Sequence, residues 1–148
     1  SSLDISSCIL VWCWEDFHEK YIDFNIFEKL IKVLNSLFDI VEFKPHPQYP
    51  VYLNTENLVQ LPPSIPALEF IDANKVVIGL SSAVLIEAIM ADCKNVYSVI
   101  DMFPDIPKEI LFDQKNWLKE EMLEYNLNGI IFIEDMEQLK DCCKKTLN

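Results

Sequence analysis

Short apolar runs alternate with helical patterns along the chain, and this alternation constrains the fold more than any other feature. We expect five strands, at residues 9–14, 40–44, 75–80, 95–100 and 129–133. We expect helices at residues 25–38, 64–72, 81 or 82 to 92, 115–125 and 135–147. Apolar strands joined by helices are typical of a parallel sheet covered on both faces. The right-handed crossover rule then predicts an α/β fold, a Rossmann-like doubly wound sheet of about five strands.

The length of the chain suits a single domain with a substantial core. It has 148 residues, of which 51% are hydrophobic. We find no linker, internal repeat or low-complexity segment, so we expect residues 1–148 to form one domain. Only two glycines occur, Gly79 and Gly129, which excludes the glycine-rich phosphate loops of Walker and dinucleotide-binding proteins.

Charge and cysteine content exclude several classes of function. The 24 acidic residues outnumber 12 lysines, giving a net charge of −12 without any arginine. This balance argues against a nucleic-acid partner, which needs a basic patch. The five cysteines form no CxxC pair, so we expect reduced thiols in a cytoplasmic protein and neither disulfides nor a metal site. No apolar run is long enough for a transmembrane segment, and the start without Met or a leader indicates a piece of a longer chain.

Two polar groups follow strands, where ligands bind in doubly wound sheets. Lys44-Pro45-His46-Pro47 follows the second strand, and its prolines stiffen the loop that carries the imidazole. Gly79-Leu80-Ser81-Ser82 leads from the third strand into a helix, whose free N–H groups and dipole favour an anion. Each group also has a simpler explanation, His46 as a surface-loop residue and Ser82 as a helix cap. Together they predict one phosphate site.

The segment after the first strand carries aromatic and acidic residues. The carboxyl end of this segment faces the predicted crevice, so one interpretation of Trp14 is that it lines the nucleotide or interdomain cleft. Trp12 and Trp14 alternate onto one face of the expected strand, and this favours packing of both in the core. Glu15 and Asp16 are expected in a solvated turn, and His18 on the surface.

Three segments together resemble the HP and SS motifs of bacterial sialyltransferases, which are GT-B glycosyltransferases and share these motifs with polysialyltransferases. They are Lys44-Pro45-His46-Pro47, Pro66-Ala67-Leu68-Glu69 and Gly79-Leu80-Ser81-Ser82. The resemblance covers about residues 41–100 of the chain. Their order and strand context make the combination more specific than any one motif.

The resemblance implies a CMP-sialic acid donor held by the C-terminal Rossmann-like half of the enzyme. His46 would contact the donor phosphate and stabilise CMP as it leaves, electrostatically or as a general acid. Ser81 and Ser82 would hydrogen-bond the same phosphate, Glu69 the ribose hydroxyls, and Lys44 would offset the negative charge. The reaction inverts the anomeric centre by direct displacement, without a metal or other cofactor.

One departure from the family concerns the catalytic base. The family carries it in an N-terminal acidic pair followed by Gly, and neither Gly79 nor Gly129 follows two acidic residues. We therefore interpret the chain as a donor-binding half, inactive alone, whose glycan acceptor binds through a missing N-terminal domain. The resemblance implies a bacterial enzyme of capsule or lipooligosaccharide synthesis at the inner membrane. The exposed interdomain face predicts a homodimer of the isolated domain.

Three alternatives stay open at this point. A similar Ser-Ser…Glu-Ala pattern, here Ser81-Ser82 with Glu87-Ala88, occurs in transferases that use CMP-Kdo or CDP-glycerol. A non-catalytic nucleotide-binding or interaction domain would also lack the acidic pair. A response-regulator receiver fits poorly, because Leu80-Ser81 stands where the third strand of a receiver ends in Asp.

Overall fold

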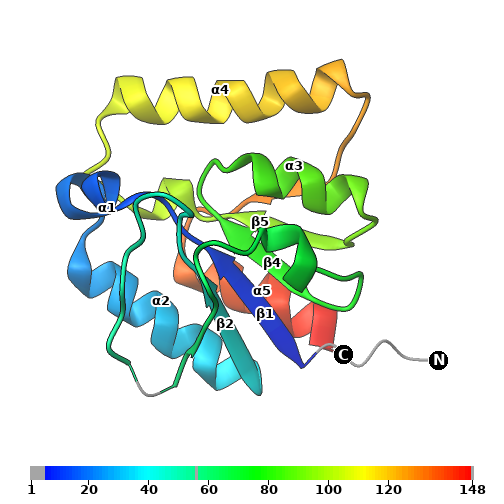
Figure 1. The fold of residues 1–148 in the computed structure, drawn as a ribbon. Helices are drawn as coiled ribbons and strands as arrows, with labels where there is room; N and C mark the ends of the chain where they lie inside the picture. Colours follow the sequence, from blue (N-terminus) through cyan, green and yellow to red (C-terminus); the bar gives the residue numbers. More distant parts are fainter. Residues whose placement is uncertain (1–5, 56, 148) are drawn as a thin grey trace.

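The computed structural model describes residues 6–55 and 57–147, and its centre is a six-stranded sheet (Figure 1). The strands are β1 (Ser7–Val11), β2 (Ile40–Lys44), β3 (Val59–Gln60), β4 (Val76–Gly79), β5 (Asn95–Ser98) and β6 (Ile130–Phe132). Every pairing is parallel, and the order across the sheet is β3-β2-β1-β4-β5-β6. The order reverses between β1 and β4, which confirms the predicted doubly wound, Rossmann-like α/β fold.

Helices cover both faces of the sheet (Figure 1). They are α1 (Glu15–Tyr21), α2 (Phe24–Leu37), α3 (Ala83–Met90), α4 (Lys108–Glu124) and α5 (Met136–Leu147), with 3₁₀ turns η1 (Ala67–Phe70) and η2 (Ile100–Met102). The pleat of β1 divides the core between the two faces. Leu10 packs in the cluster that contains the buried residues of α2 and α5, whereas Ile9 packs with those of α3 and α4. Because both faces are covered, the central strands β1 and β4 are apolar without alternation, as the sequence predicted.

Most predicted elements are present with shifted ends, and the departures have physical reasons. The turn expected at Glu15 and Asp16 is the short helix α1, in which only Phe17 is fully buried. Strand β3 lies inside the proline-rich segment and exposes both of its residues, so it carries no apolar signature. Helix α4 begins at Lys108, seven residues before the predicted start, directly after Pro107. The predicted helix at residues 64–72 is only the four-residue turn η1.

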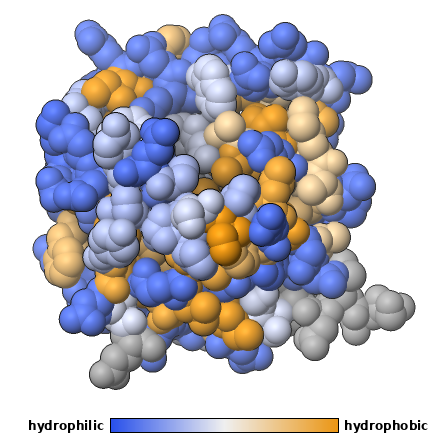
Figure 2. All heavy atoms as spheres, viewed as in Figure 1, coloured by the Kyte–Doolittle hydropathy of each residue, from blue (hydrophilic) through white to orange (hydrophobic). Residues whose placement is uncertain are grey.

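The outer surface combines hydrophilic and apolar side chains. Figure 2 shows hydrophobic residues scattered among hydrophilic ones on the face drawn in Figure 1. Isolated exposed apolar side chains of this kind need no partner to explain them. Within residues 6–55 and 57–147, no helix combines the length and apolarity that a membrane crossing requires.

Candidate functional site

A cavity of about 180 Å³ opens at the carboxyl edge of the sheet, where β1 and β4 end. Its walls come from the segments that follow β1, β2 and β4, and from one turn of α4. The lining residues are Val11, Trp12, Cys13, Trp14, Phe17, His46, Leu80, Ser81, Ser82 and Gln114. The strand order reverses between β1 and β4, and ligands of doubly wound sheets bind at that reversal. The structure thus brings His46, Ser81 and Ser82 together, as the sequence analysis expected.

The imidazole of His46 is held in one orientation by its own loop. Its Nδ1 accepts hydrogen bonds from the backbone N–H groups of Gln48 and Tyr49, both at 3.2 Å. A nitrogen that accepts carries no proton, so the neutral ring has its proton on Nε2. Burial, and then the nearby Lys44 ammonium, lower the pKa of His46 from its ordinary value of 6.5. Near pH 7 His46 is therefore a neutral ring with one N–H donor, on Nε2.

Two aromatic residues, Trp14 and Tyr49, flank the ring of His46. Its ring stacks on Tyr49 at 6.0 Å between centroids and meets Trp14 edge-on at 6.4 Å. The Glu15 N–H donates to the Tyr49 carbonyl at 3.0 Å, which ties the segment after β1 to the loop after β2. Trp14 is 41% exposed, so its predicted place in the core is wrong. β1 ends at Val11, and strand alternation does not extend to this residue.

Trp12 does lie in the core, 3% exposed, as predicted. Its indole N–H donates to Nδ1 of His18 at 2.8 Å, and the His18 ring meets Phe27 edge-on at 5.1 Å. The prediction that His18 is a surface residue is therefore wrong. The half-buried His18 imidazole accepts the only polar hydrogen of the Trp12 side chain, and burial lowers the pKa of His18.

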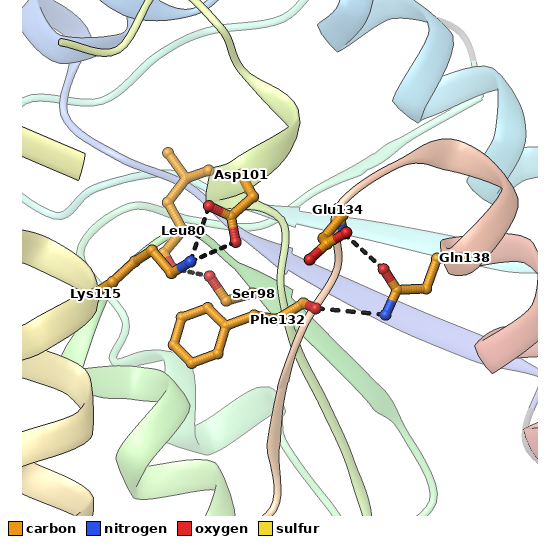
Figure 3. A network of polar contacts seen from close by, with 7 residues as sticks. All are labelled: Leu80, Ser98, Asp101, Lys115, Phe132, Glu134 and Gln138. Atoms are coloured by element: carbon orange, nitrogen blue, oxygen red, sulfur yellow. Dashed lines mark hydrogen bonds and ion pairs between the residues drawn. The ribbon is translucent and has the colours of Figure 1, made fainter. Parts of the chain in front are cut away.

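The two serines after β4 have different roles. Ser82 is the N-cap of α3, since its Oγ accepts from the Val84 N–H at 3.1 Å. Ser81 instead donates its hydroxyl proton to Oε1 of Gln114 on α4, at 2.6 Å. The backbone before them is fixed by the buried hydroxyl of Ser98, which donates to the Leu80 carbonyl (Figure 3). Helix capping therefore explains Ser82, whereas the Ser81 hydroxyl links the loop after β4 to Gln114 on α4.

Three predicted site residues do not line the cavity. Lys44 is 3% exposed, and its ammonium donates to the carbonyls of Pro45 at 2.8 Å and Pro63 at 2.9 Å. It therefore holds the loop that carries the imidazole, and desolvation lowers its pKa. Glu69 is exposed on η1, outside the lining residues.

Gly79 is the third of these, and it is the last residue of β4. A Cβ at this position would stand 3.2 Å from the Val11 carbonyl oxygen and 3.3 Å from Leu85 Cδ2. The glycine therefore permits close approach of β1, β4 and α3 and contacts no ligand itself.

Sequence reasoning missed Gln114, Cys13 and Phe17 as lining residues. Gln114 lies in the part of α4 that the sequence did not predict to be helical, so no pattern placed it near the serines. Cys13 directly follows the buried Trp12, and burial raises the pKa of its thiol to about 12. None of the three belongs to a recognisable motif, and only their spatial neighbours identify them as lining residues.

The electrostatic character of the cavity is unusual for an anion site. The side chains that line it include no Asp, Glu, Lys or Arg, and both His46 and Cys13 are neutral near pH 7. Its side-chain donors are the His46 Nε2–H and the amide of Gln114, and the N-cap Ser82 places the cavity at the start of α3, where the helix dipole favours negative charge. Within the described residues, no three His, Cys, Asp or Glu side chains gather as metal ligands.

Comparisons with protein-family models, curated proteins and solved structures gave no significant match to this chain. The expected resemblance to sialyltransferases has no support from these comparisons and rests only on the motif residues of the chain. Of the residues in the three motif segments, His46, Leu80, Ser81 and Ser82 line the cavity.

Proposed function

We propose that this chain is the donor-binding half of an inverting glycosyltransferase and binds CMP-sialic acid in the cavity between β1 and β4. One observation carries the proposal. His46 and the serine pair come from segments far apart in sequence, yet they line one cavity at the reversal of strand order. Two short motifs that resemble those of one enzyme family thus line the same cavity, at the edge where doubly wound sheets bind nucleotides.

The neutral lining favours a donor with a single negative charge at its phosphate. Removing charge from water is costly unless opposite charge or many hydrogen bonds replace the solvent. The cavity lining offers hydrogen-bond donors and a helix N-terminus, and the Lys44 ammonium is directed at carbonyls instead. A CMP-linked sugar has a phosphodiester with one negative charge, whereas CDP-glycerol has a pyrophosphate with two. Within the proposed class, this supports a CMP-linked donor over a CDP-linked one.

His46 supplies a hydrogen bond to the departing phosphate. As the bond between the anomeric carbon and the phosphate oxygen breaks, negative charge grows on CMP, and a fixed N–H donor stabilises it. The lowered pKa of His46 and the two bonds to its Nδ1 favour this electrostatic role over proton donation. The base that deprotonates the acceptor hydroxyl would come from the missing half.

The size of the cavity fits a half-site. Small-molecule sites usually measure about 300–1,000 Å³. This cavity measures about 180 Å³, which suits a phosphate and its nearest groups better than a whole nucleotide sugar. A second surface would therefore complete the site, as expected for one half of a two-domain enzyme.

Calorimetric titration with CMP tests the proposal. UMP, ADP and CDP are titrated separately, as controls for specificity. We expect CMP to bind most tightly and His46→Ala to weaken it by about tenfold or more, the loss typical of one hydrogen bond to a charged group. Ser36→Ala is the matched control, because the Ser36 hydroxyl bonds the Val33 carbonyl within α2, outside the cavity lining. Failure of all four nucleotides to bind, or CMP binding that survives His46→Ala, would refute the proposal.

A further inference from the structure

Gln114 enters the cavity from α4, outside every motif found in the sequence. Its Oε1 accepts the Ser81 hydroxyl proton at 2.6 Å, and its side chain is partly buried. Oε1 and Nε2 lie on opposite branches of the planar amide, so Nε2 points away from Ser81. Within the described part of the chain, Nε2 has no hydrogen-bond acceptor. The cavity is thus lined by an amide whose oxygen is held by Ser81 and whose N–H groups are available to a ligand.

The next residue along α4 fixes the rotation of the helix that aims Gln114. The Lys115 ammonium contacts both carboxylate oxygens of Asp101, at 2.8 and 3.0 Å, and lies 5.1 Å from the centroid of the Phe132 ring (Figure 3). The side chains of this ion pair are only 26% and 17% exposed, so solvent screens it less than a surface pair. Asp101 lies in η2, at the carboxyl end of β5. The sheet edge therefore holds α4 beside the cavity.

We propose that Gln114 is a ligand-contacting residue of this cavity, whose amide N–H groups donate to the donor phosphate while Ser81 holds its oxygen. This inference rests on the proposed function and adds a specificity-determining residue to it. Ser81 becomes a positioning residue, because its only proton is committed to Gln114. The phosphate then has two neutral side-chain donors, the His46 Nε2–H and the Gln114 Nε2–H, in a cavity that Ser82 places at the start of α3.

Gln114→Glu tests this inference sharply. The substitution keeps an oxygen that accepts from Ser81 and replaces the donor nitrogen by a second, negatively charged oxygen. We expect CMP affinity to fall by more than about tenfold, because a lost donor and a new like charge both oppose the phosphate. The new carboxylate should also raise the pKa of His46 across the cavity, measured by NMR titration of its ring protons.

Two further variants make the result specific. Lys119→Gln lowers the charge of α4 by the same single unit, and Lys119 lines another cavity, so CMP affinity and the His46 titration should not change. Gln114→Ala removes the amide without adding charge and should lose at least about threefold in affinity. It keeps the test valid if the glutamate variant unfolds.

The outcomes separate this inference from the proposed function. If the unmodified chain binds CMP and His46→Ala weakens it, but Gln114→Glu and Gln114→Ala bind as the unmodified chain does, the role of Gln114 is refuted and the donor site stands. If the unmodified chain binds no CMP, both proposals fall. Equal losses in Gln114→Glu and Lys119→Gln would also refute contact, since overall charge alone would then explain them.

Discussion

His46→Asn separates the two jobs that the structure gives to one imidazole. Nδ1 accepts the N–H groups two and three residues further on, those of Gln48 and Tyr49, and an asparagine oxygen makes the same bonds in Asx turns. The variant therefore keeps the acceptor that holds the loop and removes the Nε2–H donor, because the shorter asparagine amide does not reach the position of Nε2. It also removes the ring contacts with Trp14 and Tyr49. A hydrogen bond to a charged group contributes about 1.5–3 kcal/mol, and each 1.4 kcal/mol is about tenfold in affinity. We expect CMP affinity to fall by about 10- to 150-fold with little change in stability.

His46→Ala provides the contrast, because it loses the donor and also leaves both backbone N–H groups to water. Gln48 and Tyr49 are exposed, so the cost to folding is about 1 kcal/mol. Calorimetry with CMP and urea unfolding, run on both variants, measure the two effects separately. Equal affinity of His46→Asn and the unmodified chain would refute the donor role. A stability loss in His46→Asn as large as in His46→Ala would refute the role of Nδ1 in the loop.

Three further predictions concern the cap, the thiol and the response to pH. Ser82→Ala should lower the free energy of unfolding by about 1 kcal/mol, seen as a fall in Tm of about 2–4 °C, because Val84 N–H loses its acceptor; an unchanged Tm would contradict the cap. Cys13, whose thiol pKa is raised to about 12, should react with iodoacetamide at pH 8 far more slowly than an ordinary thiol, and CMP should slow it further; mass spectrometry of its peptide measures both rates. Burial lowers the pKa values of His18 and His46, so both bind protons more tightly in the unfolded chain than in the folded one. Their contribution to the free energy of unfolding is therefore present above pH 6.5 and is lost as the pH falls below it. Urea midpoints at pH 7.5 and 5.5 should therefore differ more in the unmodified chain than in a His18→Gln/His46→Asn variant; equal differences would contradict this assignment.

The fold could be predicted because its helices and strands differ in hydrophobic period and its central strands, β1 and β4, are buried on both faces. The run around Ile9 and Leu10 shows this well, since each residue packs on a different face and both must be apolar. Strand β3 escaped prediction because its two residues are exposed and its existence depends only on backbone pairing with β2. The start of α4 escaped because the residues between Lys108 and Gln114 include none that is fully buried.

The site could be predicted only where residues directly follow strands. His46 and Ser81 stand at the ends of β2 and β4, and parallel strands bring such positions to one edge. Lys44 carried the same signal, yet its long side chain turns back to the carbonyls of Pro45 and Pro63. Contacts that depend on where a distant helix packs, such as that of Gln114 with Ser81, leave no mark in the local sequence.

The most direct test of the donor site is a residue-by-residue map of CMP binding by ¹H–¹⁵N NMR. We expect CMP to shift the amide signals of residues 46–49 and 80–84 and the side-chain amide signal of Gln114, while the amide signals of α2 and α5 do not move. We also expect saturation with CMP to raise the pKa of His46, because a bound anion favours the protonated ring. Shifts confined to other surfaces, or an unchanged His46 titration at saturation, would refute a donor site in this cavity.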